Sequence, residues 1–160
     1  MRKTQLKLNK NVVCITFLGL CLVAISGCAT STTSASSSVV SSSDNLYQTL
    51  GGKAKIDEIV DNFINEIAFD QETYAFFKDS NMQRFKEKLS EQLCVMAQGP
   101  CTYTGDSMEQ VHTGMNITEA NFNHGVDLFI NAMDKADIPH NVQNRLLNEM
   151  AKTRKQMLYR

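Results

Sequence analysis

Residues 108–118, MEQVHTGMNIT, combine a short helical segment with a histidine and, just after it, a helix-start signal. Met108 precedes His112 by four residues, so the two side chains share one face of a helix, with Val111 adjacent. A histidine on an apolar face needs a partner for its ring nitrogens, because leaving a buried polar group unpaired costs about 1 to 3 kcal/mol. A metal ion is one such partner, so His112 is a candidate metal ligand.

The other two histidines are not expected to join His112 as ligands of a metal ion. His124 lies roughly opposite the apolar stripe of its segment and His140 follows a proline at a helix start, so both are expected at the surface. No further set of His, Cys and carboxylate side chains stands at helical spacing to complete a zinc or di-iron site. A lone histidine in an apolar pocket suits heme better, because the porphyrin supplies four ligands. A solvated helix histidine without a metal remains the alternative.

Apolar residues recur at helical spacing from residue 46 onward, and no stretch alternates as a half-buried strand would. The fold class is therefore all-α, with one domain over residues 46–160. Its apolar stripes, taken alone, indicate only the core of a small helical bundle. The expected helices are 46–50, closed by Gly51-Gly52; 53–69; a turn within 71–81; 81–98; 108–112; one after the N-cap Thr118; and a last one opened by Pro139.

Residues 1–27 have the layout of a secretory signal: four basic residues near the start, the apolar run VVCITFLGLCLVAIS, and small residues before Cys28. Ile25-Ser26-Gly27-Cys28 resembles the bacterial lipobox, which implies cleavage before Cys28 and lipidation of that cysteine. An ordinary signal peptide with an incidental cysteine is the alternative. Ala29, where an aspartate would favour the inner membrane, makes the outer membrane the preferred destination.

Residues 28–45 comprise the acylated Cys28 and a stretch of mostly Ser, Thr and Ala, which buries too little apolar surface to fold. We expect a flexible tether. The protein is thus predicted to lie in the bacterial cell envelope, facing the periplasm and held to the membrane through its lipid anchor.

The net charge and the cysteine content limit the kinds of partner that the protein can be expected to bind. Of 16 basic and 17 acidic residues, four basic ones fall in the leader, which leaves a net charge of −5 and no Lys/Arg cluster. This composition argues against a nucleic-acid partner. In an exported protein, Cys94 and Cys101 favour a disulfide over a redox-active or metal-binding pair. CxxCH, the motif of covalent heme attachment, is absent.

Taken in order, the segments LYQTLGG, IDEIVDNF, AFF, FKEKLSEQL, GPCTYTG, MEQVH and NITEANF resemble a group I truncated hemoglobin over residues 46–160. The resemblance implies a truncated globin, a two-over-two helical sandwich around heme b (iron protoporphyrin IX), with His112 as the proximal iron ligand. Lys88 matches a position where a basic side chain pairs with a heme propionate. The implied cofactor-binding residues are Phe63, Ile64, Phe76, Phe77, Phe85, Lys88, Leu89, Tyr103, Met108, Met115, Ile117 and Phe122.

The chain departs from the family pattern on the other face of the heme. Group I truncated hemoglobins commonly hydrogen-bond oxygen through a tyrosine and a glutamine, and the matching residues here are Ile64 and Leu89. Losing such a hydrogen bond costs about 1 to 3 kcal/mol, roughly tenfold to a hundredfold in affinity. We therefore expect fast oxygen release and less discrimination against CO and NO. Gln92 and Tyr74 are the candidate substitutes for the absent donors.

The predicted function is reversible binding of O2, NO or CO through a proximal-histidine heme, without enzymatic turnover. One alternative is a heme enzyme that detoxifies NO, nitrite or peroxide, which the absence of a distal acid or base disfavours. Such an enzyme would need a redox partner. A heme-free helical lipoprotein of the envelope is the second alternative.

Overall fold

The computed structural model describes residues 45–160, and every regular element in that range is a helix. This confirms the all-α prediction. The predicted signal peptide and Cys28 lie outside the described residues, as does the tether except for Asn45, which caps the first helix. The helices are α1 (Leu46–Leu50), α2 (Gly52–Phe69), α3 (Gln71–Tyr74), α4 (Met82–Met96), α5 (Met108–His112), α6 (Glu119–Lys135), α7 (His140–Ala151) and α8 (Arg154–Met157).

Side-chain caps set where several helices begin. Asn81, Ser107 and Thr118 each accept a hydrogen bond from a backbone N–H three residues ahead, at the starts of α4, α5 and α6. Ser107 and Thr118 also form capping boxes, with Gln110 and Asn121. Local sequence therefore fixes the starts of the two helices that flank the stretch after His112.

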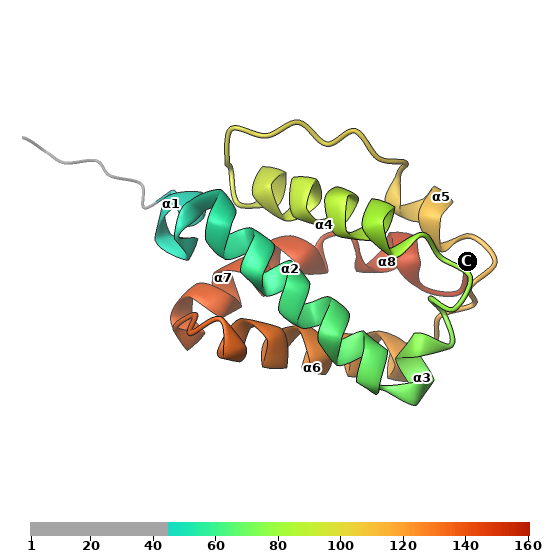
Figure 1. The fold of residues 1–160 in the computed structure, drawn as a ribbon. Helices are drawn as coiled ribbons and strands as arrows, with labels where there is room; N and C mark the ends of the chain where they lie inside the picture. The colour runs from blue at the N-terminus through green and yellow to red at the C-terminus, as the bar shows by residue number, and fades with distance from the viewer. Residues whose placement is uncertain (1–44) are drawn as a thin grey trace, which may run out of the picture. The chain divides into compact units, whose positions relative to one another are not determined.

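The helices pack in two layers around a shared core. In Figure 1, α2 and α4 lie in front of α6 and α7, and α2 packs against both α4 and α6. This is the expected two-over-two arrangement. The core is made by side chains from both layers: Leu46, Leu50, Ile56, Ile59, Val60, Leu93, Cys94, Ala97, Phe129, Met133, Ala136, Ile138, Val142 and Leu146.

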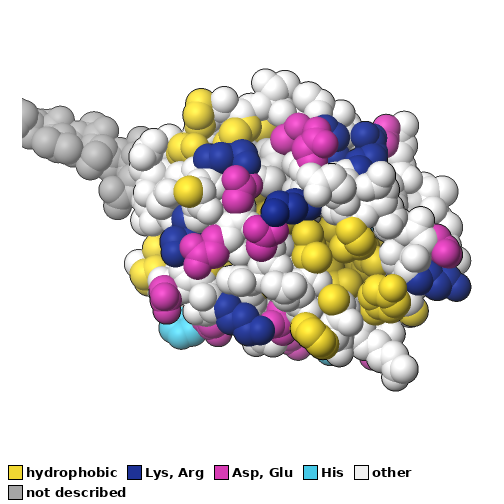
Figure 2. Space-filling model, viewed as in Figure 1, with side chains coloured by type: hydrophobic (Ala, Val, Ile, Leu, Met, Phe, Trp, Pro, Cys, Tyr) yellow, Lys and Arg dark blue, Asp and Glu magenta, His cyan; other side chains and the backbone are white. Residues whose placement is uncertain are grey.

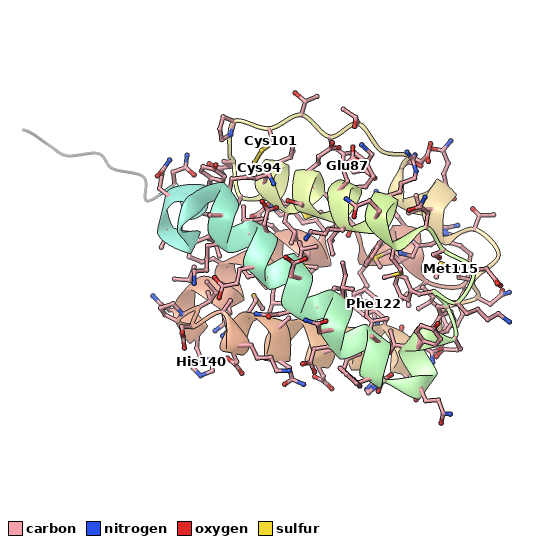
Figure 3. The ribbon with its side chains drawn as sticks, in the orientation of Figure 1. Glu87, Cys94, Cys101, Met115, Phe122 and His140 are labelled. Carbon is pink, nitrogen blue, oxygen red and sulfur yellow. A yellow bond between two sulfur atoms is a disulfide. The ribbon has the colours of Figure 1, made fainter. Side chains whose placement is uncertain are left out.

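Residues 97–107 leave the end of α4 and return along that helix to reach α5 (Figure 1). A disulfide joins Cys94 on α4 to Cys101 in this segment, as the sequence predicts (Figure 3). Gly99 allows the close turn, because a Cβ atom there would lie 2.4 Å from Cδ2 of Tyr47 and 2.6 Å from Sγ of Cys94. The segment is thus held tightly where it leaves α4.

Over residues 45–160, no helix is both long enough and apolar enough to cross a bilayer.

Candidate functional site

A cavity of about 760 Å³ lies between the two layers and is lined mainly by apolar side chains. Its size falls in the range of roughly 300 to 1,000 Å³ typical of cofactor sites. On the right of the face drawn in Figure 2, hydrophobic side chains gather at the surface. The sequence-predicted residues on the cavity wall are Phe63, Phe76, Phe77, Phe85, Lys88, Leu89, Tyr103, Met108, His112, Met115, Ile117 and Phe122.

His112 is the last residue of α5 and lines this cavity half-buried. Its Nδ1 lies 2.6 Å from the backbone oxygen of Met108, and since a carbonyl only accepts, Nδ1 carries the donated proton. Burial lowers the pKa of His112, against a smaller opposing effect of this hydrogen bond. The neutral ring is thereby favoured, and Nε2 is the nitrogen that can coordinate a metal.

The wall contributed by α2, the 75–81 segment and α4 includes several aromatic rings. The rings of Phe77 and Phe85 lie 4.8 Å apart between centroids, and Phe63 meets Phe129 edge-on at 5.3 Å. Ile64 is the exception among the predicted cofactor residues, because it does not line the cavity and packs against the core instead. One step along α2 turns a side chain by about 100°, which carries Ile64 away from the face that Phe63 presents.

Lys88 reaches the cavity as expected, but its ammonium group already has protein partners. Nζ lies 2.7 Å from Oε1 of Glu87, 3.1 Å from Oε1 of Glu91 and 2.5 Å from Oγ1 of Thr104. The hydrogen bond to Glu87 is the main cause that raises the pKa of Lys88, so the side chain stays charged. The structure therefore adds three protein contacts to the propionate contact that the resemblance implies.

The two candidate substitutes for the missing distal donors have different positions. Gln92 lines the cavity, and its amide donates to Sδ of Met108 at 2.7 Å. Tyr74 is 48% exposed and does not line the cavity. Of the two, only Gln92 is in a position to meet a bound molecule.

Several cavity residues from the second layer are absent from the sequence prediction. They come from α6, α7 and α8, whose apolar positions the sequence assigns only to a core or, for α8, to no helix. A cavity and a core are lined by the same apolar spacing, so periodicity alone cannot separate them. These residues are Val126, Phe129, Leu147, Met150 and Met157.

The remaining histidines lie outside the cavity wall. His124 Nε2 contacts Oδ2 of Asp70 at 2.8 Å, and His140 lies at the other end of the unit from Met115 (Figure 3). Within residues 45–160, no group of three or more His, Cys, Asp or Glu side chains could hold a metal ion. One histidine on a large apolar cavity fits heme, a cofactor that brings four of its own iron ligands.

The family model described as "Bacterial-like globin" matches residues 45–159 of this chain. Among curated relatives, the group 1 truncated hemoglobin GlbN of Mycolicibacterium paratuberculosis is 31% identical over 107 residues, covering 67% of this chain and 79% of the relative. The group 1 truncated hemoglobin of Tetrahymena pyriformis is 26% identical over 113 residues, covering 71% and 93% respectively.

Solved structures agree with these matches. A point mutant of the Tetrahymena pyriformis truncated hemoglobin in its Fe(III) form superposes with a TM-score of 0.70 at 25% identity, covering 72% of this chain and 99% of that one. The 2/2 hemoglobin of Synechococcus sp. PCC 7002 gives a TM-score of 0.66 at 19% identity over 71% of this chain and 98% of its own, which shows the shared fold. The chain therefore belongs to the bacterial-like globin family as a group I truncated hemoglobin, and this membership implies heme as its cofactor.

Proposed function

We propose that this protein reversibly binds a diatomic gas, O2, NO or CO, at a heme b whose iron is held by Nε2 of His112. The observation that carries the proposal is the position of His112 on the cavity wall, with Nδ1 fixed by the Met108 carbonyl. When bound, heme supplies an iron atom with a coordination position left open for a gas. The chain's own part is to hold the histidine neutral and correctly turned.

Apolar side chains would hold the porphyrin, since a flat apolar ring displaces water from both cavity walls. Met115 and Phe122 come from the chain around α5 and α6, and Phe77 and Phe85 from the opposite wall. Charged groups at the cavity would meet the acidic edge of the cofactor. Lys88 is the foremost of these, and Glu87 and Glu91 would share its ammonium group with a propionate.

The wall formed by Phe63, Phe85 and Leu89 supports weak retention of oxygen. None of these side chains donates a hydrogen bond, so a polarised ligand such as O2 gains nothing there. The same feature argues against proton-coupled turnover, which needs a positioned acid or base. Gas binding that holds CO or NO well relative to O2 therefore fits the pocket better than NO, nitrite or peroxide chemistry.

Loading the mature protein with heme tests the proposal. We expect a Soret band whose position shifts when the ferrous protein meets CO, and loss of that spectrum in His112→Gly, restored by added imidazole. His140→Gly is the matched control, since the His140 side chain is exposed and lies off the cavity wall. An unchanged spectrum in His112→Gly would remove this residue as the iron ligand, and a wild type that takes up no heme would favour the heme-free alternative.

We also propose that the protein is exported and anchored by lipid at Cys28, facing the periplasm, with the outer membrane as its destination. The leader and lipobox support this, and so does the Cys94–Cys101 disulfide, because disulfides persist in oxidising compartments. Labelling cells with a palmitate analogue should mark the wild type but not Cys28→Ala. Cys21→Ala, in the leader, should keep the label, and label retained in Cys28→Ala would rule out this anchor.

A further inference from the structure

We infer that Glu91 is a positioning residue for His112: its carboxylate clamps the segment before α5 onto α4 and so sets where the proximal helix begins. The inference rests on the proposed function, because it assigns His112 to the iron. Glu91 is not placed on the cavity wall, so it acts through the chain between Thr104 and α5.

The proximal helix has little packing of its own to hold it. α5 spans Met108–His112, and none of its residues is buried. A helix of five residues is too short to be stable by itself in water. Its place in the molecule must therefore be set by the chain on either side and by contacts from neighbouring elements.

Side chains of α4 hold the preceding segment along its length. Their contacts are the Cys94–Cys101 disulfide, the hydrogen bonds of Glu91 to Thr104, the hydrogen bond of Lys88 to the Thr104 hydroxyl, and the 3.3 Å ion pair of Arg84 with Asp106. Cys94, Glu91 and Arg84 are spaced by three and seven residues, which places them on one face of α4. Figure 3 shows the first contact, and Figure 1 shows the segment following α4 towards α5.

Among the contacts that lie close to α5, the one made by Glu91 holds the backbone of the segment. Its Oε2 accepts from the backbone N–H of Thr104 at 2.9 Å and lies 2.9 Å from the Thr104 hydroxyl, while Oε1 accepts from Lys88. The Glu91 side chain is 21% exposed, whereas Arg84 and Asp106 are both more than half exposed, and exposed ion pairs contribute little.

The chain is short between the clamp and the histidine. Thr104 lies three residues before Ser107, the N-cap of α5, and His112 is the final residue of that helix. The hydrogen bond from Thr104 is also the main cause that lowers the pKa of Glu91, so the carboxylate stays ionised at neutral pH. Without Glu91, the Thr104 backbone loses its contact with α4. The segment is then held only through side chains, by the disulfide, the Lys88 bond to the Thr104 hydroxyl and one exposed ion pair, and α5 gains freedom to shift.

Glu87 provides a matched control for the experiment. It binds the same ammonium group of Lys88 at 2.7 Å, and its labelled side chain extends from α4 in Figure 3. Glu87→Ala and Glu91→Ala each remove one carboxylate from Lys88, but only Glu91→Ala removes the acceptor of the Thr104 amide. A difference in behaviour between the two variants therefore measures the effect of the Glu91–Thr104 contact, and not the effect of removing a carboxylate from Lys88.

The first measurement uses the heme-free protein. We expect hydrogen exchange at the Thr104 amide to be about tenfold faster in Glu91→Ala and unchanged in Glu87→Ala, as lost hydrogen bonds to charged groups predict. In the heme-loaded protein, Glu91→Ala should lose heme to an acceptor globin about tenfold faster. Its iron–histidine stretching band should also shift or broaden. Glu91→Gln, which keeps an acceptor oxygen, should give intermediate values.

The results of these measurements can refute the role of Glu91 and the proposed function independently of each other. Equal exchange and equal heme loss in the two alanine variants would refute the clamp, even if the wild type binds heme and gas normally. A wild type that takes up no heme would instead refute the function, while the exchange measurement would still decide the clamp. If Glu91→Ala does not fold, as judged by helical circular dichroism, the comparison of Glu91→Gln with Glu87→Gln decides the same question.

Discussion

Leu89 on α4 lines the cavity, and Phe85 lines it one turn earlier on the same helix. Both side chains are apolar, and the amide of Gln92, three residues beyond Leu89 on α4, donates to the sulfur of Met108. A gas in this part of the cavity therefore meets hydrocarbon. The individual side chains on the cavity wall therefore set how fast each gas dissociates, whereas the fold provides the cavity.

Replacing Leu89 with glutamine should slow oxygen release. A new hydrogen bond to a polarised ligand is worth about 1 to 3 kcal/mol, so the oxygen dissociation rate of Leu89→Gln should fall roughly tenfold to a hundredfold. CO, which is less polarised, should change little. Rapid-mixing measurements on the two ferrous complexes test this, with Leu89→Met as an apolar control. If O2 and CO slow equally, a steric effect would replace the hydrogen-bond explanation.

A site residue could be predicted from the sequence where its chemical type and its local spacing already indicate its role. His112 follows from being the histidine on an apolar face, together with the family resemblance. Ile64 lies off the cavity wall, and the sequence could not show this because its position depends on how α2 is rotated against its neighbours. The partner of Lys88 at Thr104 is sixteen residues away, and no local spacing foretells a contact made by a returning loop.

Among the elements, α3 and α6 are joined by a titratable contact. His124 on α6 meets Asp70, the N-cap of α3, and Asn121 donates to Glu72 at 2.8 Å. The hydrogen bond to Asp70 raises the pKa of His124, and the pKa of Asp70 is lowered, mainly by the Thr73 amide and next by His124. This contact holds the short helix that leads into Phe76 and Phe77.

The stability that this contact contributes should depend on pH. Because the folded-state pKa of His124 lies above its unfolded value near 6.5, the contribution is complete below about pH 6.5 and is lost as the pH rises through the raised pKa. At the acid end it is lost as Asp70 protonates, below its usual range. The free energy of unfolding should thus differ more between wild type and His124→Gln at pH 6 than at pH 9.

Asp70→Asn supplies the control for this titration, since asparagine still caps a helix but carries no charge. In an Asp70→Asn background, the effect of His124→Gln on the free energy of unfolding should no longer depend on pH. A pH dependence that persists unchanged would assign the effect to other charges near His124.

The long amphipathic helices and the capped short ones were predicted correctly, and α8 was not. α2, α4 and α6 each run for four or more turns and carry an apolar stripe, and Thr118 and Gly51-Gly52 mark their boundaries as expected. α8 has four residues and no buried side chain, so no periodicity could reveal it. Such an element forms because the rest of the molecule places it.

At the scale of the whole molecule, side chains from both layers surround a volume that protein atoms leave unfilled. A cofactor that fills it binds the folded state and not the unfolded chain. Heme should therefore stabilise the wild type, by about 2.7 kcal/mol when free heme is a hundredfold above its dissociation constant. Chemical unfolding at several heme concentrations tests this, and the gain should be smaller in His112→Gly. A midpoint independent of heme would contradict it.

The cavity also links the abundance of the protein to the supply of its cofactor. A chain without heme lacks part of its interior, so it opens more often, and transiently opened chains are the ones that proteases remove. Cells short of iron or porphyrin should then hold less of this protein at an unchanged rate of synthesis. The half-life of the protein should therefore rise and fall with the amount of heme that reaches the compartment where it folds.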